Sequence, residues 1–238
     1  MSSPTSITEI DLTPLTGKTY FNCDREWREE FIYFLMVDRF HDSKARTPVN
    51  SSARSSGSGT LQQLKKFCGG TLKGIKDHID YLEQLGCSSV WLFENNDAPD
   101  PNSDKYHGYS IQNYLDVDPR FGTKQDLIDL VDAAHSRNMR VFLDVVTNHS
   151  GDNWAYSDDN PFFYFNDIQF QFGKFRRPDR PLPKELQNPN FYHRRGQIRN
   201  FDDLRQARRG DFFTLDFNND EDSDGLQLID ILVKAHCY

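Results

Sequence analysis

The sequence predicts an α/β fold with parallel strands, because three short apolar runs alternate with segments of helical periodicity. The runs are 31–37, 88–93 and 140–146, and each is bounded by polar or charged residues. Short apolar runs of this kind are typical of strands buried on both faces. Strands that alternate with helices lie parallel and are joined by right-handed crossovers. Two architectures fit, a closed eight-stranded barrel and an open doubly wound sheet. No Gly-x-Gly-x-x-Gly turn follows the first run, which disfavours dinucleotide binding.

Two segments between the runs predict helices. In the first, apolar residues recur at helical spacing and Gly86 stands where the helix would stop. These residues are Leu72, Ile75, Ile79, Leu82 and Leu85. In the second, Thr123 and Asp126 mark a helix start, and the following residues supply its apolar face.

The segment 147–225 departs from this rhythm and predicts an irregular subdomain inserted after the third strand. It is rich in aromatic, Asn, Asp and Arg residues and contains five prolines. Its aromatic residues either form the core of this subdomain or line a glycan groove. Its arginines either pair with nearby acids on the surface or form a nucleic-acid patch. Residues 226–238 are again amphipathic and helical, so we divide the chain at 1–146, 147–225 and 226–238.

The composition of the chain limits which partners and which cellular location we expect. The net charge of −8 over 238 residues argues against a nucleic-acid partner. The four cysteines form no Cys-x-x-Cys pair, so we expect free, mostly buried thiols in a reducing compartment. No apolar stretch approaches the roughly 20 residues of a membrane helix. The polar N-terminus resembles no signal peptide, so we expect a cytoplasmic protein that does not bind membranes.

Polar side chains gather where the predicted strands end, which is where barrel enzymes place their active sites. These residues are Asp38, Arg39, the segment 94–97, Asp144, Asn148 and His149. Solvated strand ends would explain any one of them, but less readily the whole cluster.

Two motifs indicate a family. The first is Tyr106-His-Gly-Tyr109, which continues through Tyr114 and then Val117-Asp-Pro-Arg-Phe-Gly-Thr123. The second is Asp144-Val-Val-Thr-Asn148-His149, at the end of the third strand. In this order and on these elements they resemble the catalytic barrel of the α-amylase family of glycoside hydrolases. Tyr33-Phe-Leu-Met-Val-Asp-Arg-Phe40 matches the first strand of that barrel. The resemblance extends from about residue 30 to the end of the chain and implies a TIM-type (β/α)8 barrel.

The resemblance implies a role for five residues. Tyr106 would stack on the sugar ring next to the cleaved bond, because an aromatic face suits the apolar face of a pyranose. His149 would hydrogen-bond the same sugar, and Asp144 would support the site from below. Asn148 and Asp216 would be calcium ligands, since hard oxygen atoms suit that cation. Ser110 and Glu94 depart from the family, where Trp and Pro are common.

Glycoside hydrolysis requires two carboxylates that flank the scissile bond. In the family these two stand on the fourth and fifth strands and an assisting Asp stands on the seventh, whereas only three strands are predicted here. We therefore expect an incomplete barrel of the first three β/α units, with an irregular inserted subdomain after the third strand. This would be the N-terminal portion of an enzyme acting on α-glucans, and it would be inactive alone. The alternatives are a non-catalytic carbohydrate-binding or interaction protein and a truncated product without function.

Overall fold

The computed structural model describes residues 3–42, 68–93, 96–97, 107–151, 154–156, 169–175, 177, 179–211, 216–217 and 223–237. The chain forms two compact units. One comprises Pro14–Gly108 and Val117–Asp144, and we call it the sheet unit. The other comprises Met1–Thr13, Tyr109–Asp116 and Val145–Tyr238, and we call it the aromatic unit.

The sheet unit is built on three parallel strands in the order β1-β2-β5. They are β1 (Ile32–Met36), β2 (Ser89–Phe93) and β5 (Arg140–Leu143). The predicted parallel strands are thus confirmed. β5 is shorter than expected, because its last ladder pair is Leu92 with Leu143 and β2 itself ends one residue later. The short segments η2 (Trp27–Glu29), α1 (Val37–Phe40) and β3 (Asn96–Asp97) complete the unit.

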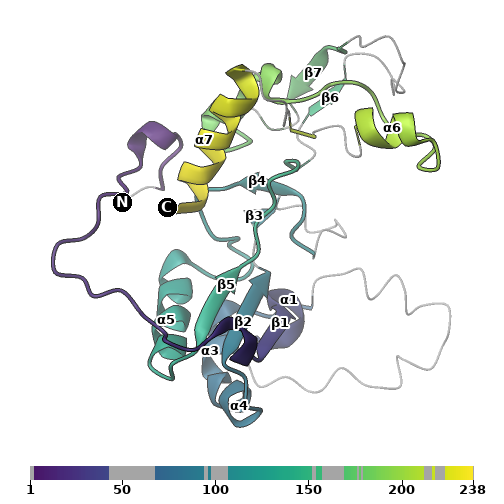
Figure 1. The fold of residues 1–238 in the computed structure, drawn as a ribbon. Helices are drawn as coiled ribbons and strands as arrows, with labels where there is room; N and C mark the ends of the chain where they lie inside the picture. The colour runs from purple at the N-terminus through teal and green to yellow at the C-terminus, as the bar shows by residue number, and fades with distance from the viewer. Residues whose placement is uncertain are drawn as a thin grey trace. The chain divides into compact units, whose positions relative to one another are not determined.

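Figure 1 labels the helices of the sheet unit, and side-chain caps and glycine set where they begin and end. α5 (Lys124–His135) begins with a capping box between Thr123 and Asp126, as predicted. The other predicted helix is divided into α3 (Leu72–Asp77) and α4 (Ile79–Gln84). The break falls at His78, whose ring Nδ1 donates to the Gly74 carbonyl oxygen over 3.0 Å. Gly86, with φ +86°, lies just beyond this helical segment in the conformation that favours glycine.

One face of the sheet is buried, and the other is buried only in part. Leu35, Val90 and Leu92 belong to the core shared with α3, α4 and α5. Phe34 and Trp91 pair in register on the opposite face, where they are 53% and 40% exposed. The expectation of strands buried on both faces is confirmed for the face against which the helices pack, and for the opposite face it stays a prediction.

A buried carboxylate joins the beginnings of the three strands. Glu30 precedes β1, and its side chain has no exposed surface. It accepts hydrogen bonds from the hydroxyls of Ser88 and Ser89, at the start of β2. Arg25 and Arg140 form ion pairs with the same carboxylate, and Arg140 is the first residue of β5. The network holds the three strand starts in register.

The aromatic unit packs short elements against one long helix, α7 (Ser223–Cys237). Its strands are β4 (Ile111–Asn113), β6 (Trp154–Tyr156) and β7 (Phe172–Phe175). Its other helical segments are η1 (Ile7–Glu9), η4 (Lys184–Gln187), η5 (Pro189–Phe191) and α6 (Leu204–Arg209). β6 and β7 pair antiparallel.

The aromatic residues described in this unit form a core rather than an open groove. Trp154, Tyr192 and Phe217 are at most 2% exposed and pack with the buried face of α7. The predicted aromatic residues at 162–165 lie outside the described residues. The expectation that the arginines pair with nearby acids on the surface is met by some of them. Arg177 and Arg180 pair with Asp179, whereas Arg194 is buried at 6% exposure.

All four cysteines are free, as expected, but only Cys87 is buried. Cys68 and Cys237 are exposed, so the expectation of mostly buried thiols is wrong. A cytoplasmic location stays a prediction. Within the described ranges no helix has the length and apolarity to cross a bilayer.

Candidate functional site

Parts of the two motifs meet in the aromatic unit, at Tyr109, Tyr114 and His149. His149 lies forty residues beyond Tyr109 in the chain, yet its ring Nε2 donates to the Tyr109 carbonyl oxygen over 2.8 Å. The hydroxyl of Tyr114 donates to the backbone oxygen of His149 over 3.0 Å. Two residues of the first motif therefore fix both the ring and the backbone of the histidine in the second.

A glycine allows this close approach. The amide of Gly151 donates to the Ile111 carbonyl oxygen over 2.5 Å. A Cβ atom at position 151 would overlap the backbone of Ser110 and the side chain of Gln112. Only glycine lets the chain after His149 pass directly beside β4.

The hydrogen bonds of His149 assign its neutral tautomer. A carbonyl oxygen only accepts, so the contact with Tyr109 places the ring proton on Nε2. The other nitrogen, Nδ1, then accepts from the side-chain amide of Asn148 over 3.3 Å. This second bond is long, so Asn148 is the partner that a ligand hydroxyl displaces more easily.

Asn148 and Asp216 are brought together through their backbones. His149 and Asp216 form an antiparallel bridge, and the amide of Phe217 donates to the Asn148 carbonyl oxygen over 2.8 Å. Asp216 is 8% exposed, whereas Asn148 is exposed. Over the described part of the chain, no three His, Cys, Asp or Glu side chains form a group that could hold a metal.

Asp144 belongs to the sheet unit. Its carboxylate accepts from the indole nitrogen of Trp91 over 3.0 Å. Its backbone amide donates to Leu92, which continues the β2–β5 ladder by one bond. Burial raises the pKa of Asp144, and the hydrogen bond from Trp91 acts in the opposite direction. The side chain is thus held in place by β2.

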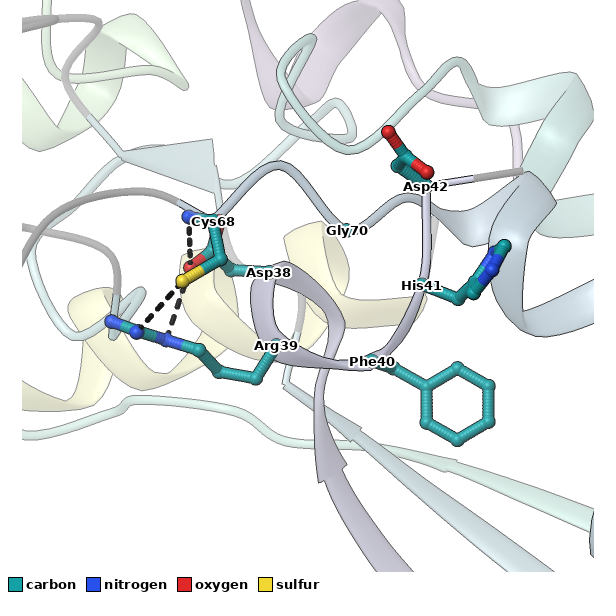
Figure 2. Close-up of a pocket in the computed structure, with 7 residues that line it drawn as sticks. All are labelled: Asp38, Arg39, Phe40, His41, Asp42, Cys68 and Gly70. Carbon is teal, nitrogen blue, oxygen red and sulfur yellow. Dashed lines mark hydrogen bonds and ion pairs between the residues drawn. The ribbon is translucent and has the colours of Figure 1, made fainter. Parts of the chain in front are cut away.

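The residues that follow β1 line a small pocket of about 160 Å³. Figure 2 shows Asp38 and Arg39 beside Cys68 in this pocket. The Asp38 carboxylate is buried and accepts from the amides of Cys68 and Gly69, and it also pairs with Arg39 over 3.1 Å. Arg39 further donates to the Cys68 sulfur over 3.0 Å. Asp38 is therefore a residue that organises the chain and is not presented to a ligand.

The structure brings Asn148, His149 and Asp216 into one place and leaves Asp144 in the other unit. Tyr106 and Glu94 lie outside the described residues. Sequence reasoning missed Tyr109 and Tyr114 as partners of His149, although both stand in the quoted motif. It also missed the role of Trp91, for which an aromatic residue near a polar strand end was the available signal.

Comparisons with known proteins give consistent matches. The family model described as the alpha amylase catalytic domain matches residues 34–214. A cyclomaltodextrin glucanotransferase of Klebsiella oxytoca is 32% identical over 212 residues, which is 86% of this chain and 30% of that protein. An uncharacterized glycosyl hydrolase of Schizosaccharomyces pombe is 31% identical over 190 residues, which is 79% of this chain and 32% of that protein.

Solved structures agree. The α-amylase of Geobacillus thermoleovorans, determined with acarbose, matches with a TM-score of 0.57 and 30% identity. The match covers 87% of this chain and 37% of that one. The chain spans about a third of the length of the curated relatives given above.

Proposed function

The chain belongs to the family of α-amylase catalytic domains, and on that premise we propose that it forms the sugar-positioning part of an α-glucan site. Family membership implies a TIM-barrel-type fold, of which the parallel sheet β1-β2-β5 is a part. We assign the three strands to the first three β/α units of the barrel. We assign 147–225 to an irregular insertion after the third strand, and 226–238 to the next barrel helix.

The observation that carries the proposal is the hydrogen bond between His149 and Tyr109. It joins the two motifs that the family resemblance identified independently, and it does so at the residue expected to bind sugar. The neutral tautomer leaves Nδ1 as an acceptor, so a sugar hydroxyl that displaces Asn148 donates its proton there. Tyr106 would then cover the apolar face of the same ring.

In this proposal the described residues bind and orient the sugar, and we assign none of them a step of the reaction. Glycoside hydrolysis requires two carboxylates on opposite sides of the bond. Of the described strand-end carboxylates in the sheet unit, Asp38 is occupied by backbone amides and Arg39, and Asp144 is bonded to Trp91. The proposed enzyme is therefore a glycoside hydrolase or transglycosylase to which this chain contributes binding alone.

Binding of an α-1,4-linked glucose tetramer tests the proposal, with a β-1,4-linked tetramer as the matched control ligand. Isothermal titration of the wild-type chain should show the α-linked tetramer alone to bind. His149→Ala should weaken binding about tenfold, since one lost hydrogen bond of about 1.4 kcal/mol corresponds to that factor. Asp202→Asn, at an exposed carboxylate of the same unit, should leave affinity unchanged. Equal binding of both tetramers, or full affinity in His149→Ala, would contradict the proposal.

We further propose Asn148 and Asp216 as oxygen ligands of a calcium ion. In support, a backbone bridge between His149 and Asp216 and a hydrogen bond from the Phe217 amide to the Asn148 carbonyl oxygen bring the two residues together. Carboxylate and amide oxygen atoms are the ligands that calcium prefers. Calcium takes six to eight oxygen ligands, so the two side chains fit as part of a site and do not complete one.

Thermal unfolding in calcium and in a chelator tests this assignment. We expect calcium to raise the melting temperature of the wild type and to have no effect on Asp216→Asn. Magnesium serves as the control cation, because its demand for near-octahedral geometry makes it a poor substitute. An identical calcium shift in the wild type and in Asp216→Asn would exclude Asp216 as a ligand.

A further inference from the structure

The side chain of Asp211 joins two segments of the aromatic unit. It is fully buried, and its Oδ2 atom accepts from the hydroxyl of Tyr156 on β6. The same oxygen accepts from the amides of Arg195 and Gly196, each over 3.0 Å. Three donors from β6 and from residues 192–198, which we call the 192–198 loop, thus converge on one oxygen atom.

The other oxygen atom of this carboxylate, Oδ1, is buried and has no hydrogen-bond partner among the described residues. An ionised carboxylate would leave half its charge unsatisfied there, which costs far more than burying a neutral acid. The arrangement therefore accommodates the protonated form of Asp211 better than the ionised form.

The conformation of the 192–198 loop depends on these bonds. Arg194 has φ +54°, which is unfavourable for a residue other than glycine, and Gly196 has φ +88°. Backbone hydrogen bonds join Asp211 to Gly196 and to Ile198, over 2.8 and 3.2 Å. When the side chain of Asp211 releases the amides of Arg195 and Gly196, the strain at Arg194 favours a relaxed loop.

The same loop supports the candidate sugar site. The amide of His193 donates to the Asp216 carbonyl oxygen over 3.1 Å, and Tyr192 pairs with Phe217. Asp216 in turn pairs with His149. A continuous strip of backbone contacts therefore runs from the 192–198 loop to the histidine.

We propose that Asp211 is an acid-closed latch, whose protonated side chain holds the 192–198 loop against β6 and thereby steadies His149. The part concerning His149 rests on the proposed function, whereas the latch itself does not.

The titratable groups around Asp211 are consistent with a protonated side chain in the closed state. Burial raises the pKa of Asp211 to about 7, and the charge of Asp216 raises it further against the hydrogen bonds from Tyr156 and Gly196. Burial and the neighbouring Asp211 raise the pKa of Tyr156, so the phenol stays a donor. Burial lowers the pKa of Arg194, whose guanidinium bonds to neutral oxygen atoms. The loop also carries the titratable side chains of Tyr192, His193 and Arg195, and burial raises the pKa of Tyr192.

Linkage between protonation of Asp211 and closure of the loop gives the direction of the pH dependence. The ordinary pKa of an aspartate is 3.8, and that of Asp211 in the closed state is raised to about 7. Closure is therefore strongest below the ordinary value, and it weakens as pH rises through the raised one. Between the two values the closing equilibrium falls about tenfold per pH unit, and it levels off above about pH 7.

Amide hydrogen exchange of the full chain, in a chelator and without sugar, tests the latch. After correction for intrinsic rates, protection of Arg195 and Gly196 in the wild type should fall about 50-fold from pH 5 to pH 7. Asp211→Asn, a neutral isostere, should show protection independent of pH, and Asp202→Asn should behave as the wild type. Constant protection in the wild type, or an unchanged pH dependence in Asp211→Asn, overturns the proposal.

Tyr156→Phe provides a second test of the latch if the Asp211→Asn variant does not fold. The hydrogen bond from Tyr156 lowers the pKa of Asp211, so its removal should move the midpoint of the wild-type transition to higher pH. An unmoved midpoint overturns the latch. Because no sugar is present, a protein that shows the latch but binds no glucan refutes only the proposed function.

Discussion

Replacing Glu30 with glutamine should weaken the sheet unit, because this single carboxylate joins the beginnings of all three parallel strands. Oε1 of Glu30 accepts from Nε of Arg25 over 3.2 Å and from Nη1 of Arg140 over 2.6 Å. Oε2 accepts from the hydroxyls of Ser88 and Ser89. Glutamine keeps the shape of the side chain but loses the charge, and its amide group faces donors where the carboxylate offered an acceptor.

The magnitude follows from the two charged contacts. Hydrogen bonds to charged groups contribute about 1.5–3 kcal/mol each, so two of them give about 3–6 kcal/mol. The side chains of Arg25 and Arg140 are 27% and 14% exposed, so both can recover water after the substitution. We therefore expect the lower end, about 3 kcal/mol, which corresponds to about 6–12 °C in melting temperature for a chain of this size.

The assay must report on the sheet unit, since a chain with two compact units need not unfold in one step. Hydrogen exchange of the β1, β2 and β5 amides at increasing urea concentrations does so. Glu29→Gln is the matched control, because Glu29 is the exposed neighbour and its loss should cost within about 0.5 kcal/mol. Equal destabilisation by the two substitutions would refute the role assigned to Glu30.

The pH dependence gives a second check on the same residue. Burial acts to raise the pKa of Glu30, but the hydrogen bonds from Ser88, Ser89 and Arg25 outweigh it, and the pKa lies below its ordinary value of 4.5. The stabilisation is thus fully present above that value and is lost as pH falls through the lowered pKa. The difference in stability between the wild type and Glu30→Gln should shrink over that window. A difference that stays constant as the solution is acidified would contradict the reasoning.

Three further predictions concern single contacts. Trp91→Phe removes the hydrogen-bond donor that lowers the pKa of Asp144 against the effect of burial. The titration of Asp144, followed by carboxyl carbon NMR, should therefore move to higher pH. An unmoved titration would show that the contact is absent. Gly151→Ala should destabilise the aromatic unit by about 1–3 kcal/mol in chemical unfolding, because the new methyl group overlaps the backbone of Ser110. An unchanged stability would show that the close approach of residue 151 to Ser110 is not needed. Thr123→Ala should lower the free energy of unfolding by about 1 kcal/mol through loss of the cap of α5, whereas Thr123→Ser keeps the capping hydroxyl and should keep the stability. Equal effects of the two substitutions on stability would exclude the capping box.

Much of the sheet unit could be predicted from local pattern. Apolar runs placed β1, β2 and β5, and the capping residue Thr123 placed the start of α5. The exposure of Phe34 could not be predicted in this way. An apolar run has the same composition whether one face or both are covered, and coverage depends on where distant helices pack.

The candidate site was predictable only as a set of residue types. The motif around Tyr109 and the motif around His149 indicated sugar binding, but not that the ring of one would bond to the backbone of the other. Backbone carbonyls carry no sequence signal, so hydrogen bonds to them escape any motif. Asp144, a member of the second motif, lies with Trp91 in the other unit.

The sequence by itself determined the family, the order of the strands and helices, and the polar residues at the strand ends. These follow from periodicity, capping and spacing, which are properties of neighbouring residues. Only the tertiary structure decided the surroundings of Asp211, an aspartate with no distinguishing neighbours in the chain. Its burial, the three donors to one of its oxygen atoms and the lack of a described partner for the other arise from segments separated by up to fifty-five residues. Charge in a protein interior is governed by what surrounds it in space, and that arrangement exists only in the folded chain.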